Sequence, residues 1–201
     1  MDKKISRSEL KRRAIIGAAM SEFQTKGFKA TSMDDVAKRA EVSKRTVYNH
    51  FSSKEALFSA IILEMMALLC AFEYFTFSDD IALEVQLEKL VDIEVEQLKS
   101  QAFMDMARVI IAEAVHSPEL IQGAMDEFNK QETPLNTWFQ AALEAGALKG
   151  QSHEIIVTQF VGVIKAFCFW PQLLQGAAFP SDEEVVAIKK TVVEMVLKQY
   201  S

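Results

Sequence analysis

The chain of 201 residues is poor in helix breakers, with only seven glycines and four prolines. Half of its residues are hydrophobic, so it can form a sizeable core, and the scarcity of breakers favours an all-α protein. The two longest apolar stretches are interrupted by Glu64 and Lys165, so we expect no membrane span. The charged N-terminus lacks the apolar segment of a signal peptide, which favours a cytoplasmic location.

Metal-binding and catalytic patterns are also scarce. Cys70 and Cys168 match no metal-ligand spacing and have no electropositive neighbourhood in the sequence, so reduced core thiols are expected rather than a redox switch. Glu113 and His116 are three residues apart, but two ligands do not make a metal site. The chain lacks a Gly-rich phosphate loop, a G-x-S-x-G motif and an H-E-x-x-H motif. We therefore expect no enzyme, no cofactor and no metal.

Charge is unevenly distributed along the chain. Residues 1–55 hold 13 Lys and Arg against 7 Asp and Glu, whereas the remainder holds 9 against 21. A basic N-terminal segment on an acidic chain indicates that this segment meets a polyanion and the rest does not. Chance clustering of charge is the alternative explanation.

Two short helices are predicted in the basic segment, over roughly 33–40 and 44–50. The pair Thr31–Ser32 marks the first start, and Ser43 is a good N-cap for the second. Two such helices joined by about three residues are typical of a helix-turn-helix, whose second helix enters the major groove of DNA.

The outward face of this second helix carries Lys44, Arg45, Tyr48 and Asn49. Lysine and arginine donate to guanine edges or phosphates, and asparagine pairs with adenine. Tyr48 and the neighbouring His50 can donate to phosphate oxygens. The alternative is a plain three-helix bundle with a solvated basic face.

The rest of the chain reads as one run of helical patterns. We expect helices over roughly 80–100, 103–116, 118–146, 152–174 and 182–199. Pro134 should kink or split the third of these, and Ser181 with Glu184 has capping-box spacing at the start of the last.

The stretch from Ile15 to Phe58 closely resembles the DNA-binding domain of TetR-family transcription regulators. The matching residues are ordered and specific, and they include Gly27–Phe28, Val36–Ala37, Val47–Tyr48 and His50–Phe51. The resemblance implies a DNA-binding domain over residues 1–55 and an effector-binding and dimerisation domain over 56–201. It implies DNA contacts at Thr31, Ser32, Lys44, Arg45, Thr46, Tyr48, Asn49, His50 and Lys54. Glu41 departs from the family pattern, which often has glycine there; a left-handed turn residue with a side chain costs about 1 kcal/mol.

The segment from Met104 to Gln122 is similar to the AefR-like branch of the same family. This resemblance implies an effector cavity in the body, whose Met- and Phe-rich interior suits an adaptable apolar or aromatic ligand. The expected ligand contacts are Met65, Met66, Phe72, Phe103, Met106, Ile110, Phe128 and Trp138. Ordinary core packing is the alternative role for these residues.

The segment 152–174 is apolar on nearly every side, so it must be covered both by its own domain and by something else. A second copy of the chain is the simplest cover, in a two-fold symmetric four-helix interface with the last helix. The expected interface residues are Phe160, Val163, Ile164, Phe167, Val185, Ile188, Val192, Met195 and Val196.

The sequence therefore predicts a ligand-responsive repressor that binds a palindromic operator as a homodimer and is released by a small effector. The competing hypothesis is a helical small-molecule binder or enzyme whose basic segment is not used on DNA.

Overall fold

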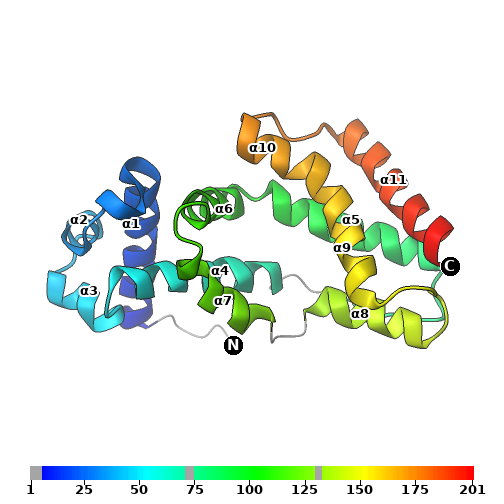
Figure 1. Cartoon of the computed structure of the whole chain (residues 1–201), viewed down its shortest axis with the longest axis horizontal. Helices are drawn as coiled ribbons and strands as arrows, with labels where there is room; N and C mark the ends of the chain where they lie inside the picture. Colours follow the sequence, from blue (N-terminus) through cyan, green and yellow to red (C-terminus); the bar gives the residue numbers. More distant parts are fainter. Residues whose placement is uncertain (1–5, 71–74, 130–132) are drawn as a thin grey trace. The chain divides into compact units, whose positions relative to one another are not determined.

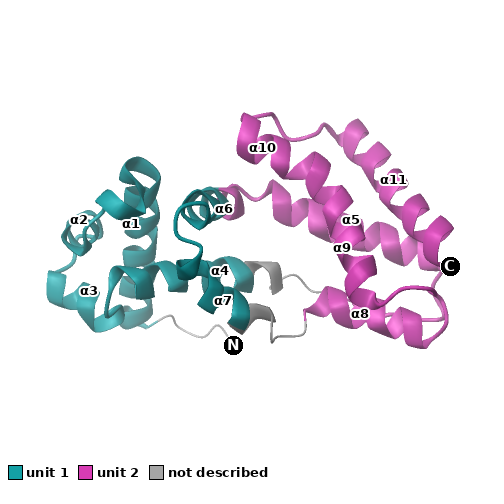
Figure 2. Cartoon of the chain, in the orientation of Figure 1, with its two compact units in different colours: residues 1–67, 105–130 teal, residues 68–104, 131–201 magenta. Residues whose placement is uncertain are grey.

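A computed structural model describes residues 6–70, 75–129 and 133–201, without the side chains of residues 68–70 and 127–129. The regular structure of the described residues is helical throughout, which confirms the predicted all-α class (Figure 1). The chain forms two compact units, here called the head unit (residues 1–67 and 105–130) and the body unit (residues 68–104 and 131–201) (Figure 2). These compact units are not the predicted functional domains, and the domain boundary at residue 55 stays a prediction.

The head unit begins with three capped helices. Its helices are α1 (Arg7–Ala30), α2 (Met33–Arg39), α3 (Lys44–His50), most of α4 (Lys54–Cys70), most of α6 (Gln101–Ala114) and α7 (Glu119–Asn129). Ser6, Ser32 and Ser43 are the N-caps of α1, α2 and α3, and each side chain accepts a hydrogen bond from a backbone N–H in the first turn. The caps at Ser32 and Ser43 confirm the predicted starts of α2 and α3, and each of the three caps satisfies a donor that the helix itself leaves unpaired.

The helix α1 is interrupted at Gly27, whose φ of 80° and ψ of 161° are not helical. Glycine adopts positive φ without steric cost, so the regular helix can be interrupted at this position. Phe23 and Phe28, which lie on the two sides of Gly27, form a mutual cluster with Phe58, with ring centroids 5.1–6.0 Å apart. This cluster joins both segments of α1 to α4.

Glu41 lies in the turn between α2 and α3 and has a φ of 53°, so it occupies the left-handed region expected from the sequence. Its side chain is exposed and no ion pair or hydrogen bond within the described part of the chain uses it. We expect Glu41→Gly to raise the free energy of unfolding by about 1 kcal/mol, because glycine removes the steric cost. Chemical denaturation of the two proteins measures this difference, and a less stable variant would contradict the expectation.

The body unit contains α5 (Leu83–Lys99), α8 (Pro134–Glu144), α9 (His153–Cys168), α10 (Trp170–Gln175) and α11 (Asp182–Tyr200). The helix α9 packs against α5, α8 and α11, and α5 also packs against α11. Pro134 is the first residue of α8, so the predicted split of the 118–146 helix is confirmed. Ser181 and Glu184 form the predicted capping box at the start of α11.

The prediction of one helix over 152–174 is wrong. The chain leaves helical geometry at Phe169 (φ −135°, ψ −60°), because Pro171 lacks the N–H that would bond the carbonyl oxygen of Phe167. The buried side chain of Gln172 donates to that carbonyl oxygen instead, at 3.1 Å. The segment 153–175 is long and apolar enough to cross a membrane, but the buried face of α9 packs within the body unit.

Candidate nucleic-acid interface

Buried apolar side chains anchor the helix α3, and Ser43 caps its N-terminus. Val47 is fully buried and Phe51, the residue after the helix, is nearly so. The hydroxyl of Ser43 accepts from the backbone N–H of Thr46 at 3.1 Å and also lies 2.8 Å from the Thr46 hydroxyl. These contacts leave only one face of α3 directed toward solvent.

The solvent-facing side of α3 holds the predicted base-reading residues. Arg45, Tyr48 and Asn49 are exposed, and 45% of the Tyr48 surface is accessible. An exposed tyrosine and an exposed asparagine on one short helix supply an aromatic surface with a donor and a bidentate amide. The structure therefore brings these three predicted residues together on one surface.

Lys44 and His50 lie at the two ends of this surface. The Lys44 ammonium is 2.7 Å from the Asp34 carboxylate of α2, and this hydrogen bond raises the pKa of Lys44. Because the pair is exposed, water and salt screen it and a phosphate can compete for the ammonium. His50 is half-buried beside Phe51.

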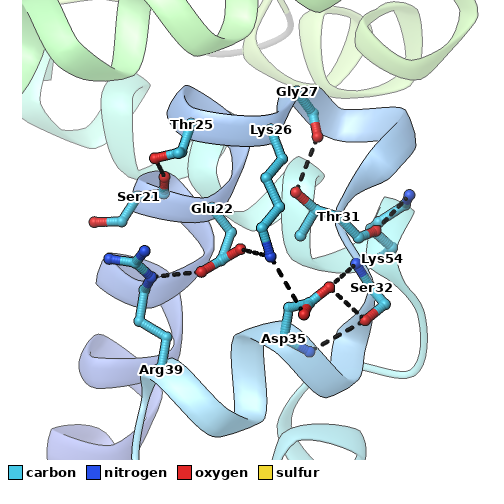
Figure 3. Close-up of polar contacts among 10 residues, drawn as sticks. All are labelled: Ser21, Glu22, Thr25, Lys26, Gly27, Thr31, Ser32, Asp35, Arg39 and Lys54. Carbon is cyan, nitrogen blue, oxygen red and sulfur yellow. Dashed lines mark hydrogen bonds and ion pairs between the residues drawn. The ribbon is translucent and has the colours of Figure 1, made fainter.

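A network of charged side chains ties α2 to α1 (Figure 3). The buried carboxylate of Glu22 accepts from Arg39 Nε at 2.6 Å and pairs with Lys26 Nζ at 2.7 Å. Lys26 also reaches Asp35 at 3.3 Å, and Asp35 closes the capping box with Ser32. Sequence analysis missed Glu22 and Arg39 as positioning residues, although the spacing of Glu22 and Lys26 is that of a helical ion pair.

The contribution of Asp35 in this network to stability depends on pH. Hydrogen bonds from the hydroxyl and backbone of Ser32, then from Lys26, lower the pKa of Asp35 from 3.8 to about 2. A lowered pKa in the folded state stabilises the protein above pH 4, and this stabilisation is lost as the pH falls toward 2. We expect Asp35→Asn to be less stable than the wild type at pH 6 and to lose less stability between pH 4 and 2. Parallel acid denaturation curves at these pH values would contradict this role.

Thr31 and Lys54, two other predicted DNA contacts, form hydrogen bonds within the head unit. Thr31 is only 2% exposed, and its hydroxyl donates to the carbonyl oxygen of Gly27 at 2.9 Å (Figure 3). The Lys54 ammonium donates to the carbonyl oxygens of Phe28, Lys29 and Thr31 at 2.6, 3.2 and 2.9 Å. An ammonium has three donors, so these three bonds leave none for a phosphate. Ser32 is exposed but serves as the cap of α2.

The predicted ligand contacts are divided between the two units. Met66, Met106 and Ile110 are buried in the head unit and Met65 is half-buried there. Phe103 and Trp138 are buried in the body unit. Phe72 and the side chain of Phe128 lie outside the described residues.

Trp138 lines a pocket of about 210 Å³ in the body unit, together with Phe75, Phe77, Thr137 and other residues of α8. The Phe75 and Phe77 rings meet the indole edge-on, with centroids 6.2 and 5.5 Å away. The buried indole Nε1 has no hydrogen-bond partner among the residues that the structure describes. The pocket is smaller than the roughly 300–1,000 Å³ typical of drug-sized ligands, so it suits a compact one.

The predicted dimer residues separate into two groups. Phe160, Ile164, Val192 and Val196 are fully buried in the core of their own chain, and Ile188 is 7% exposed. Phe167 is 47% exposed, and Val163, Val185 and Met195 are half-buried. Trp170, Leu174 and Val186 are also exposed but were not among the predicted interface residues, because periodicity alone does not say which apolar stripe faces inward.

Two family models match the sequence. The model described as bacterial regulatory proteins of the tetR family matches residues 15–61, and the C-terminal domain of AefR-like transcriptional repressors matches residues 85–201. The second match alone covers more than half of the chain.

This chain belongs to the TetR family.

Known proteins support the same assignment. A TetR-family regulator from Pseudomonas syringae pv. tomato is 36% identical, with a TM-score of 0.83 over 95% of this chain and 96% of that one. The regulator UidR of Escherichia coli K12 is 41% identical over 64 residues, 32% of this chain and 33% of UidR. The regulator RutR of the same strain is 28% identical over 117 residues, 58% of this chain and 52% of RutR. The chain thus spans a third to a half of these curated relatives.

A lower-identity structural neighbour, the flavonoid-responsive regulator FrrA, shares the fold at 24% identity and a TM-score of 0.75, over 96% of this chain and 97% of FrrA. Together, the family models and relatives identify this TetR-family chain as a DNA-binding, helix-turn-helix transcription regulator. Family members are regulators, so the prediction of a non-enzyme is confirmed.

Proposed function

We propose that this regulator represses transcription in the cytoplasm by binding a two-fold symmetric operator as a homodimer, and that a small apolar or aromatic effector releases it. The observation that carries the DNA part is the exposed set Arg45, Tyr48 and Asn49 on a capped helix that is anchored by Val47. Phosphate contacts from Lys44 and His50 would position the helix, and the three exposed residues would read bases.

The dimer part rests on exposed apolar side chains along α9, α10 and α11. Phe167, Trp170, Leu174 and Val186 are all between 43% and 70% exposed. Large exposed apolar side chains on three successive helices suit an interaction surface, and a second copy of the chain would cover them in a symmetric interface.

Selection of duplexes from a random DNA pool tests the operator directly. The expected product is a two-fold symmetric site whose half-site centres lie about one helical turn apart. Arg45→Ala should select a site with relaxed preference at one position of each half-site, because one base-edge contact is lost. Enrichment of an asymmetric site, or of no site, would contradict the proposal.

The effector part rests on the pocket around Trp138, where the apolar walls and the indole N–H fit a compact aromatic molecule with an acceptor group. A ligand releases the operator only if it binds better to the DNA-free state. We expect a screen of small aromatic compounds to yield one that raises the melting temperature and weakens operator binding. Trp138→Phe should reduce both effects, and a broad screen without any such compound would contradict the sensor role.

A further inference from the structure

A pocket of about 570 Å³ lies within the head unit, between the C-terminal part of α1 and one face of α6. Its apolar wall consists of Phe23 and Phe28 from α1 and of Val109 and Ala112 from α6. The volume falls in the range of small-molecule sites, and aromatic with aliphatic walls are typical of them. This pocket is separate from the one around Trp138, which belongs to the body unit.

Glu113 supplies an unusual polar group in this pocket. The residue is only 7% exposed, and its Oε1 accepts from the Ser117 hydroxyl at 2.7 Å. No cation in the described part of the chain forms an ion pair with it. The carboxylate lines the pocket and can accept further hydrogen bonds beyond the one from Ser117, so a ligand with a donor group can be held there.

The other charged groups around the pocket favour a cation over an anion. Arg108 lies at the rim, but its guanidinium is 3.1 Å from the Asp105 carboxylate, which offsets its charge. Among the carboxylates and guanidinium of the pocket, Asp105 and Glu113 against Arg108 leave one negative formal charge. A ligand carboxylate would meet this excess negative charge, whereas an ammonium group would offset it.

We propose that this pocket is a second small-molecule site of the regulator, and that it binds an organic amine through an ammonium group on Glu113 and an aromatic or branched apolar body on Phe23, Phe28 and Val109. The pocket also includes Gly27, where α1 is interrupted before the chain enters the DNA-reading helices. The occupant therefore contacts the segment that leads to α2 and α3.

Titration of the full chain with 2-phenylethylamine, 2-phenylethanol and phenylacetate tests the site, because the three probes share a phenyl ring and differ in the polar group. The expected result, by NMR titration or calorimetry, is saturable binding of the amine at least ten-fold tighter than that of the alcohol or the carboxylate. Glu113→Gln should weaken amine binding about ten-fold or more, because it removes the charge and keeps the shape.

Two further variants separate this site from a general effect on folding. Ala112 is exposed on α6, so Ala112→Trp should fold normally, fill the pocket and abolish amine binding. Glu119 is an exposed carboxylate on α7 outside the pocket, and Glu119→Gln should leave binding unchanged. Absence of saturable amine binding, equal binding of phenylacetate, or unchanged binding by Ala112→Trp would each overturn the proposal. None of these outcomes depends on whether an effector acts at Trp138.

Discussion

Replacing Lys54 with methionine is expected to lower the free energy of unfolding by about 2–3 kcal/mol, or the melting temperature by roughly 4–12 °C. The ammonium holds three carbonyl oxygens at the end of α1 and lies 4.5 Å from the centre of the Phe28 ring. Methionine fills a similar volume but donates to none of these oxygens. The large effect follows because charge-assisted hydrogen bonds are stronger than neutral ones and several are lost together.

The same variant distinguishes a structural lysine from a phosphate contact. A lysine that contacts a phosphate lowers the salt dependence of DNA binding by about one unit when it is replaced. We expect Lys54→Met to change that slope by much less than one. The matched control is Lys29→Met, which removes an exposed charge nearby and should leave stability unchanged. A slope reduced by a full unit with wild-type stability would assign Lys54 to the DNA backbone.

Phe167→Glu is expected to convert the protein into a folded monomer that binds the operator about 100-fold or more weakly. Phe167 is 47% exposed on α9, so a charge is tolerated in the isolated chain and is costly only where a partner covers the site. The loss of affinity follows because a dimer engages two half-sites at once, and this advantage disappears in a monomer. Sedimentation and circular dichroism measure assembly and folding separately.

The contrasting variant is Val192→Asp. Val192 is fully buried in its own chain, so an unpaired carboxylate there should unfold the body unit instead of only separating two copies. A wild-type chain that sediments as a monomer at micromolar concentration would contradict the interface, and so would a full-strength dimer of Phe167→Glu.

The local features of the fold were predictable from the sequence. Ser32 and Ser43 mark the starts of α2 and α3 because a cap needs only a short polar side chain followed by a helical stripe. Glu41 was expected to have a positive φ, because the family often has glycine at this position, and it does. Pro134 is the first residue of α8, where a missing N–H costs no helical hydrogen bond.

The features that were missed depend on how elements meet in space. Glu22 and Arg39 are 17 residues apart, and their ion pair exists because α2 crosses α1 at that point. Lys54 donates to carbonyl oxygens at the end of α1 that lie 23 to 26 residues earlier in the sequence. Sequence periodicity does not reveal hydrogen bonds between residues so far apart. The break at Phe169 follows from Pro171, whose effect on the helix over 152–174 the sequence prediction did not include.

Apolar periodicity in the body unit did not distinguish core residues from interface residues. Phe160, Ile164 and Val192 have the periodicity of an interface, yet the chain uses them for its own core. When a helix is apolar on two sides, its sequence does not indicate which side is buried in the core of its own chain. Only the packing of α9 against α5, α8 and α11 shows which stripe is left exposed.

The most direct test of the account is the affinity of a triple variant, Arg45→Ala with Tyr48→Ala and Asn49→Ala, for the selected operator and for a scrambled duplex of equal length. The three side chains are exposed, so the variant should keep the wild-type melting temperature. We predict that the wild type discriminates between the duplexes by 1,000-fold or more, a typical ratio for specific regulators. The triple variant should bind both duplexes with the wild type's affinity for the scrambled one. A triple variant that still prefers the operator as strongly as the wild type would contradict the assignment of α3 as the helix that reads DNA.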